Sequence, residues 1–250
     1  MTWAAPGAEA ELRSQLERAH QQLDALCYSL SHDLHSPLRT MQEMARILLE
    51  DFSQQTPADT QVFLTHLVQG TSRLADRVEG LARFGRISRQ PPSFQRVDVA
   101  GLVAQLISDT NKSAGTGHID FVIAELPDAI GDAAMLRQLF STLLSNAIKF
   151  SRHSPAPRIE IGAHHEAGRN AYFVADNGAG FDMKYAARLF GLFQRMHPET
   201  QFEGAGVGLA IAQCIVERHG GTIRGEAAKE AGATFHFTLP AVGSGAEPGG

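Results

Sequence analysis

Two histidines flank an aspartate in the segment YSLSHDLHSPLRT, which covers residues 28–40 of the chain. The imidazole of a neutral histidine carries a nitrogen lone pair that can attack an electrophile near pH 7. On a helix, His32 is turned roughly 200° from both Leu30 and Leu34, so it points away from the apolar face that they form. Pro37 removes one helical hydrogen bond and bends the helix close to His32. His32 is therefore a candidate nucleophile, although an exposed helical histidine without any function would give the same pattern.

A second candidate group lies in VADNGAGFD, residues 174–182, at the end of a predicted strand. The carboxylate of Asp176 could accept a hydrogen bond from the exocyclic amine of adenine. Guanine presents a carbonyl at the same place, so a carboxylate there would select adenine by repulsion as well as by attraction. The run of Asn and Gly also suits an ordinary tight turn, because both residue types adopt positive φ.

Three alternate glycines open a predicted helix in FEGAGVGLAI, residues 202–211. Without side chains at Gly204, Gly206 and Gly208, backbone N–H groups can approach a phosphate chain, and the helix N-terminus adds positive potential. The spacing excludes both a Walker loop and a Rossmann glycine motif. These residues are therefore candidates for binding phosphates by backbone contacts.

Asn146 and Lys149 lie three residues apart in LLSNAIKF, so they share one face of a helix and could meet the same ligand. An asparagine oxygen suits Mg²⁺, and a lysine suits a phosphate group. The alternative is the solvated face of an ordinary amphipathic helix.

The segment LFGLFQRMH lies between the two glycine-rich segments. We expect Phe190 and Phe193 to pack this loop down, which would allow Arg195 to turn onto a terminal phosphate. A pair of phenylalanines is more often part of a hydrophobic core, and that alternative stays open for this segment alone.

Heptad repeats before residue 90 predict helices that position the histidine segment. The first series steps by four and three residues, which indicates a coiled coil rather than an ordinary surface helix, and it covers Leu12, Leu16, Ala19, Leu23, Leu26 and Leu30. After a break at residues 53–60, a second series covers Leu64, Leu67, Thr71, Leu74, Val78 and Leu81. Two such helices form an antiparallel hairpin, and two hairpins bury their stripes as a four-helix bundle. We therefore expect a homodimer.

The Pro91-Pro92 pair indicates a linker at residues 89–97, and the pattern changes beyond it. Five segments predict strands: HIDFVIAEL, RIEIGAHHE, AYFVADN, GTIRGEA and TFHFTLP. Helices are predicted at Ala133–Phe150 and Gly206–Gly220. Strands and helices mixed in this way predict an α+β fold, a sandwich with helices on one face of a mixed sheet. The expected organisation is a loose tail, a helical domain, the linker, an α/β domain and a second tail, over residues 1–10, 11–88, 89–97, 98–240 and 241–250.

The composition of the 250 residues limits the classes of partner. A formal net charge of −5 argues against a dedicated nucleic-acid binder. No apolar run approaches the ~18 residues of a membrane span, and no signal peptide is visible. The two cysteines, Cys27 and Cys214, lie far apart, which suggests a reduced, cytoplasmic setting.

Taken together, the motifs resemble those of sensor histidine kinases of two-component systems, over roughly residues 12–240. The order SHDLHSPL, NAIKF, DNGAGF, LFGLF and GAGVGLAI is similar to the family's phosphoacceptor, N, first glycine, F and second glycine boxes. The stretch around residues 193–221 is most similar to the output module of bacterial phytochromes. The resemblance implies a dimeric four-helix bundle followed by an ATP-binding sandwich of the GHKL type (histidine kinase and HSP90-like).

The resemblance also implies roles for individual residues. His32 is implied to be the phosphoacceptor and Asp33 its general base. Ser36 is implied to take part in dephosphorylation of the response regulator. Asn146 is implied to hold Mg²⁺. The residues implied to contact ATP are Asn146, Lys149, Phe150, Asp176, Gly178, Gly180, Phe190, Phe193, Arg195, Gly204, Gly206, Val207, Gly208 and Leu209. The implied partners are a second copy of the chain, the receiver domain of a response regulator and an upstream sensory domain outside this chain.

Three residues depart from the family pattern. Thr142 stands where the family often has a further asparagine, Ala205 replaces a frequent threonine near the phosphates, and Ser36 replaces a threonine or asparagine. The balance between kinase and phosphatase therefore stays open. The alternatives to a kinase are a net phosphatase of the response regulator and a dimeric ATP-binding module that signals by conformation.

Overall fold

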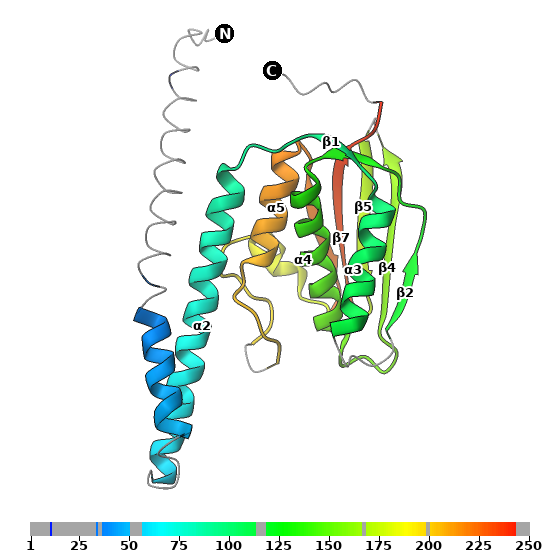
Figure 1. Ribbon diagram of the computed structural model, residues 1–250. Coiled ribbons are helices and arrows are strands. Elements are labelled where there is room, and N and C mark those ends of the chain that lie inside the picture. Colours follow the sequence, from blue (N-terminus) through cyan, green and yellow to red (C-terminus); the bar gives the residue numbers. More distant parts are fainter. Residues whose placement is uncertain are drawn as a thin grey trace, which may run out of the picture. The chain divides into compact units, whose positions relative to one another are not determined.

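The computed structural model describes residues 11, 34, 37–50, 57–113, 119–166, 169–198 and 201–243. Two compact units divide the chain, Met1–Gln90 and Pro91–Gly250. Each is described by itself (Figure 1). The expected catalytic residues of the histidine segment, His32, Asp33 and Ser36, lie outside the described residues.

The first unit contains a helix over residues 37–50 and the long helix α2, Ala58–Arg89, which run side by side (Figure 1). Helix α2 begins directly after Pro57, whose fixed φ suits the start of a helix. Leu38, Ala45 and Val78 are buried. Many other apolar side chains of the two helices are exposed in the single chain, namely Met41, Met44, Ile47, Leu48, Val62, Phe63, Leu67 and Leu74.

The second unit is built on a five-stranded mixed sheet with the strand order β2-β4-β5-β7-β6. Strands β2 and β4 pair in parallel, and the other neighbours pair antiparallel. The strands are Asp120–Ile123 (β2), Arg158–Glu166 (β4), Arg169–Asp176 (β5), Ile223–Ala227 (β6) and Ala233–Pro240 (β7). A separate two-stranded sheet joins β1, Gln95–Val97, to β3, Ala129–Gly131.

Three helices cover one face of the large sheet (Figure 1), namely α3, Val99–Ser113, α4, Ala133–Ser151, and α5, Gly208–Arg218. The core between helices and sheet contains the stacked rings of Tyr172 and Phe237, with Phe140 of α4 edge-on to both. These three residues are fully buried, so the apolar face of α4 fixes this helix on the sheet. The expected mixed sheet with helices on one face is confirmed.

Helix α4 is held firmly at its start. The buried carboxylate of Asp132 accepts hydrogen bonds from the backbone N–H groups of Ala134 and Met135, which caps the helix. Its other oxygen accepts from the N–H of Ser93. The buried ring of His219, at the end of α5, accepts from the N–H of Asp132 through Nε2 and donates through Nδ1 to the carbonyl of Ile215. This arrangement ties both helices together.

The structure corrects two of the expected boundaries. Residues 95–97, expected in a linker, form strand β1, and Ala241, expected in a loose tail, is buried and bridges to Ala129. Three-residue strands are too short to show a periodic pattern in the sequence, which is why the pairing was not expected. Helix α3 and the short 3₁₀ helix η1, Met183–Arg188, were also not expected.

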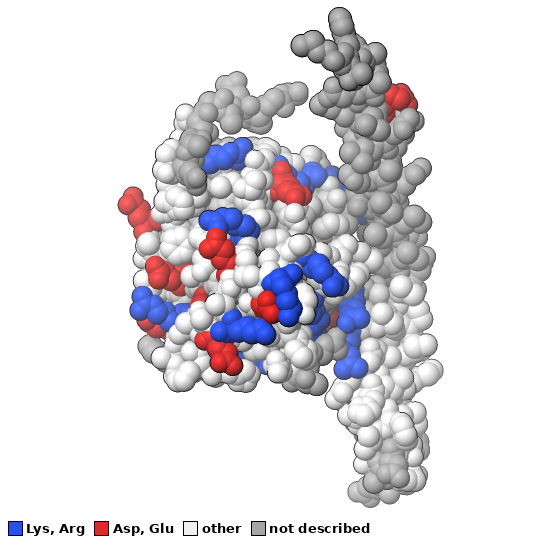
Figure 2. Space-filling model, turned by 180° about the vertical axis from the view of Figure 1, so that it is seen from behind, with Lys and Arg blue, Asp and Glu red and all other residues white. Residues whose placement is uncertain are grey.

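The surface of the second unit carries both signs of charge. Figure 2 shows Lys and Arg interspersed with Asp and Glu. Several charged residues of this unit pair directly, for example Arg224 with Glu226 and Lys184 with Asp182. Within the described part of the chain, no helix has the length and apolar character to cross a membrane.

Candidate functional site

The C-terminal half of α4 presents Asn146 and Lys149 on one face, as the spacing predicted. Lys149 Nζ donates to Asn146 Oδ1 over 3.4 Å. Partial burial lowers the pKa of Lys149, and the positive charges of Arg195 and Arg152 lower it further, while Glu203 opposes them. The ammonium group therefore lies in a cationic environment where a bound anion would be stabilised.

Asp176 is the last residue of β5 and lies opposite Ala233 of β7. Burial raises the pKa of its carboxyl to about 6, although hydrogen bonds from the backbone of Gly178 and Ala233 act in the opposite direction. The N–H of Gly178 donates to Oδ1 over 2.9 Å. A partly desolvated carboxylate of this kind gains from each further donor, such as the amine of a base.

The turn after Asp176 lies directly against the end of α4. The N–H of Ala179 donates to the carbonyl of Phe150 over 3.2 Å. A Cβ on Gly178 would collide with that same carbonyl, and a Cβ on Gly180 would collide with the carbonyl of Ala228. Gly180 also has φ 56°, a conformation that favours glycine. These glycines allow the turn to bring Asp176 and Phe150 to one end of the sandwich.

The loop between the glycine segments differs from the expectation. Phe193 is 40% exposed and has φ 61°, and Phe190 is half-buried. Leu189 and Phe202 are the side chains that are buried there. Neither expected phenylalanine is therefore a fully buried anchor of this loop.

Arg195 bonds to the second glycine segment itself. Its two terminal amino groups donate to the backbone carbonyls of Phe202 and Gly204. A Cβ added to Gly204 would lie 3.5 Å from Lys149 Nζ, so the loop approaches the ammonium group. The two cations expected to meet a phosphate chain therefore lie at the same end of α4.

The start of α5 completes this end of the unit. Gly204 and Gly206 have positive φ. The buried Val207 occupies the N-cap position without a side-chain hydrogen bond, and α5 begins at Gly208 with Leu209 half-buried. A Cβ on Gly208 would lie 3.1 Å from the side chain of Thr142, so the first turn of α5 packs on α4. The free N–H groups of a helix start favour an anion, and the preceding Gly204 is the residue of this segment that approaches Lys149.

Four residues near this end of α4 were not predicted from the sequence to belong to the site, namely Arg152, His153, His197 and Phe202. Arg152 pairs with Glu203 and donates to the carbonyl of Gln201. The rings of His197 and Phe202 contact Phe150, and the ring of His153 contacts Phe202. The histidine in LFGLFQRMH and the phenylalanine that opens the second glycine segment were both in the quoted motifs. Only their three-dimensional contacts reveal a role.

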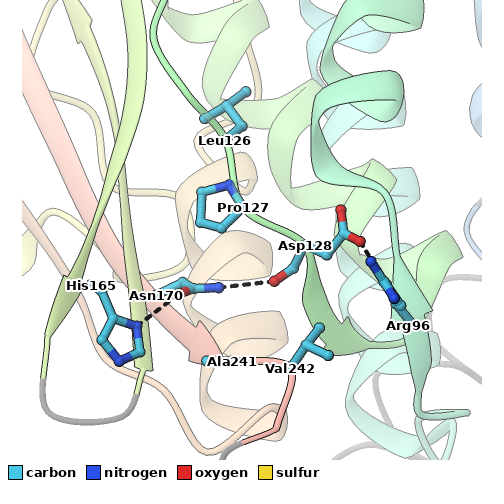
Figure 3. Close-up of a pocket in the computed structure, with 8 residues that line it drawn as sticks. All are labelled: Arg96, Leu126, Pro127, Asp128, His165, Asn170, Ala241 and Val242. Carbon is cyan, nitrogen blue, oxygen red and sulfur yellow. Dashed lines mark hydrogen bonds and ion pairs between the residues drawn. The ribbon is translucent and has the colours of Figure 1, made fainter.

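A separate hollow of about 410 Å³ lies at the opposite end of β5, near Asn170 (Figure 3). Its polar side chains bond to one another or to the backbone. Arg96 pairs with Asp128, and Asn170 bonds to His165 and to the carbonyl of Asp128. It contains none of the residues expected to bind a nucleotide.

The comparisons with known proteins agree with this geometry. Residues 131–243 match the family of histidine kinase-, DNA gyrase B- and HSP90-like ATPases. Cyanobacterial phytochrome A of Nostoc sp. (strain PCC 7120) is 33% identical over 234 residues, which are 94% of this chain and 30% of that protein. The adaptive-response sensory kinase SasA of Thermosynechococcus vestitus is 27% identical over 92% of this chain and 64% of that protein. Full-length ShkA in complex with AMPPNP has a TM-score of 0.61 and 28% identity, over 86% of this chain and 45% of that chain.

The second unit is thus an ATP-binding domain of the GHKL type. The chain as a whole is similar to the catalytic module of sensor histidine kinases, and its relatives include cyanobacterial phytochromes. This confirms the family resemblance found in the motifs. The chain spans 30% and 31% of the length of the two cyanobacterial phytochromes that it matches.

Proposed function

We propose that this chain is the kinase module of a two-component system. It uses ATP and Mg²⁺ to phosphorylate His32 and then passes the phosphoryl group to an aspartate on the receiver domain of a response regulator. In the first step the bond between the γ-phosphorus and the bridging oxygen breaks, ADP leaves, and a phosphorus–nitrogen bond forms at the imidazole of His32. Asp33 accepts the imidazole proton. Because ATP is the phosphoryl donor, the reaction belongs in the cytoplasm.

The proposal depends mainly on one observation: a hydrogen-bond acceptor for a base and two cations for phosphates lie at the same end of α4. Asp176 offers a partly desolvated carboxylate to the adenine amine, and Phe150 lies against the same turn. Lys149 and Arg195 supply positive charge near Gly204. A nucleotide has its base and its phosphates at opposite ends, so it fits a site with an acceptor at one side and cations at the other. The glycine segments Gly178, Gly180, Gly204, Gly206 and Gly208, with Val207 and Leu209, would frame it.

Magnesium supplies charge neutralisation on the phosphates, and Asn146 would contribute one oxygen to it. The described residues contain no group of three His, Cys, Asp or Glu side chains that could hold a metal by themselves. This suits Mg²⁺, which is commonly held by one or two protein oxygens together with the phosphates of its nucleotide. Asn146 Oδ1 now accepts from Lys149 Nζ. A phosphate would draw the ammonium group away and leave that oxygen for the cation.

The helical unit would present His32 and bind the partners. We propose residues 11–88 as the dimerisation and phosphoacceptor domain and residues 98–240 as the core of the catalytic domain. Exposed Met41, Met44, Phe63 and Leu67 support a homodimer, because a second hairpin would cover them. Ser36, four residues after His32, would help to position water for dephosphorylation of the regulator. An upstream sensory domain would act through the coiled coil.

The test is incubation of the wild type and His32→Ala with Mg²⁺ and γ-labelled ATP. We expect an acid-labile, base-stable label on the wild type and none on the variant. Binding of ATP without any label would instead favour a net phosphatase. The next assay would then measure the loss of phosphate from a labelled regulator. Label that persists on His32→Ala would contradict the assignment of the acceptor.

A further inference from the structure

The loop that follows Arg195 turns back onto the end of α4 through a group of rings. Phe202 is only 5% exposed, and its ring centroid lies 4.9 Å from that of Phe150 and 5.1 Å from that of His197. The rings of Phe150 and His197 are 5.3 Å apart, so each of the three touches both others. We call Phe150, His197 and Phe202 the aromatic clasp.

Two arginines hold the backbone on either side of the clasp. Arg152 lies over the ring of Phe202 at 5.4 Å, donates to the carbonyl of Gln201 over 3.0 Å and pairs with Glu203 over 3.4 Å. Arg195 donates to the carbonyls of Phe202 and Gly204. The backbone around Phe202 is therefore fixed from two directions, and its ring is fixed by the clasp.

His197 connects the clasp to the adenine side of the site. Its ring bonds to the backbone of Gly180, in the turn that follows Asp176. Burial and the nearby charges of Lys149 and Arg195 hold the pKa of His197 below its ordinary value, so the ring is neutral at pH 7. A neutral imidazole can pack against two phenyl rings without the cost of burying a charge.

The clasp connects three parts of the nucleotide site. Phe150 follows Lys149 on α4, Phe202 precedes Gly204 by two residues in the same loop as His197, and His197 bonds to Gly180 in the turn of Asp176. We call the backbone around Gly204 and Gly206 the glycine loop. Separation of the rings would release this loop from α4 and from the turn of Asp176. Loops that cover a ligand often set the rate at which it leaves.

We infer that the aromatic clasp holds the glycine loop over the bound nucleotide, and that Phe202 and His197 are positioning residues which set the nucleotide's residence time. This inference rests on the proposed ATP site. The clasp acts by fixing Arg195 and the backbone of Gly204 beside Lys149, not by direct contact with reacting atoms.

The experiment uses the full chain with Mg²⁺ and a fluorescent ADP analogue that carries an N-methylanthraniloyl group. Stopped-flow chase with excess ADP gives the dissociation rate. We expect Phe202→Ala and His197→Ala each to raise that rate about 10- to 100-fold, with association changed far less. Phe202→Tyr keeps the ring and should restore the rate to within about threefold of the wild type. Because both side chains act in one cluster, the double variant should release the analogue more slowly than the product of the two effects predicts.

The chain offers a matched control in a second edge-to-face pair. Phe94 and His219 lie 5.3 Å apart at 63°, close to the 5.1 Å and 60° of Phe202 and His197. Phe94→Ala removes a similar contact at the other end of α4, so it should lower the thermal unfolding temperature and leave the dissociation rate unchanged. A Phe202→Ala variant that folds and releases the analogue at the wild-type rate would overturn the clasp alone. Failure of the wild type to bind the analogue would overturn the ATP site and the clasp together.

Discussion

Replacement of Asp176 by asparagine should stabilise the second unit and weaken nucleotide binding at the same time. Burial raises the pKa of this carboxyl from 3.8 to about 6. The ionised form is therefore disfavoured in the folded state, and the cost is fully present above pH 6 and disappears as the pH falls toward 3.8. The difference of 2.2 pH units corresponds to about 3 kcal/mol at roughly 1.36 kcal/mol per unit.

An amide removes that cost but loses an acceptor. The carboxylate accepts from the backbone of Gly178 and of Ala233, and the single oxygen of an asparagine can keep one of these bonds well. Subtracting about 1 kcal/mol for the lost bond leaves a net stabilisation of about 2 kcal/mol at pH 8. For a unit of this size we expect the unfolding temperature to rise by roughly 4–8 °C. At pH 4 the advantage should vanish.

Nucleotide binding should change in the opposite direction. Loss of a hydrogen bond to a charged acceptor costs about 1.5–3 kcal/mol, so Asp176→Asn should weaken ATP binding roughly 10- to 150-fold by calorimetry. The amide can donate to the carbonyl of guanine, so the preference for ATP over GTP should also narrow. Asp182→Asn is the matched control, because Asp182 is in the same loop but caps η1 and pairs with Lys184. An Asp176→Asn protein with unchanged ATP affinity and a lower unfolding temperature would refute the reasoning.

Three further predictions concern stability. Glu230 has φ 60°, a conformation that costs a residue with a side chain roughly 1–2 kcal/mol. After the conformational entropy of glycine is deducted, Glu230→Gly should stabilise the protein by about 0.5–1 kcal/mol in urea unfolding. A lower free energy of unfolding would contradict this prediction. Burial lowers the pKa of His219, whose neutral ring accepts from the N–H of Asp132. The stability that this ring contributes is present above about pH 6.5 and is lost as the pH falls through the lowered pKa, so His219→Gln should show a flatter decline between pH 7.5 and 5 than the wild type. Tyr172→Phe should cost about 1–2 kcal/mol, because the hydroxyl donates to the carbonyl of Pro127 over 2.6 Å in a buried position; an unchanged unfolding midpoint would show that water replaces it.

The fold and much of the site follow from local patterns. The alternating residues of TFHFTLP predict β7, and the three-residue spacing of Asn146 and Lys149 predicts their contact on α4. Helix α3 could also have been predicted, because Val99, Leu102 and Val103 repeat with helical spacing and are buried. In each case a period of two or 3.6 residues encodes the face that is buried.

What could not be predicted depends on contacts between residues far apart in the chain. His219 reaches Asp132 across 87 positions, and no local period marks either residue as a partner of the other. The same is true of Phe202, whose ring meets Phe150 of a different element. Phe193 is a further example, because a large apolar side chain is expected to be buried and this one is 40% exposed at a residue with positive φ.

These long-range contacts lie at the two ends of α4, and that position gives them a common effect. At the first end, Asp132 caps the helix and His219 attaches α5 to it. At the other end, Lys149 and Phe150 meet the glycine loop and the turn of Asp176. The helix has 19 residues and spans about 28 Å as a rigid rod, so its cap and its packing on the sheet determine where the lysine lies. Under the proposed function, the module would therefore place its phosphate-binding groups through one well-anchored helix, and the loop around Phe202 would be the part that releases the nucleotide.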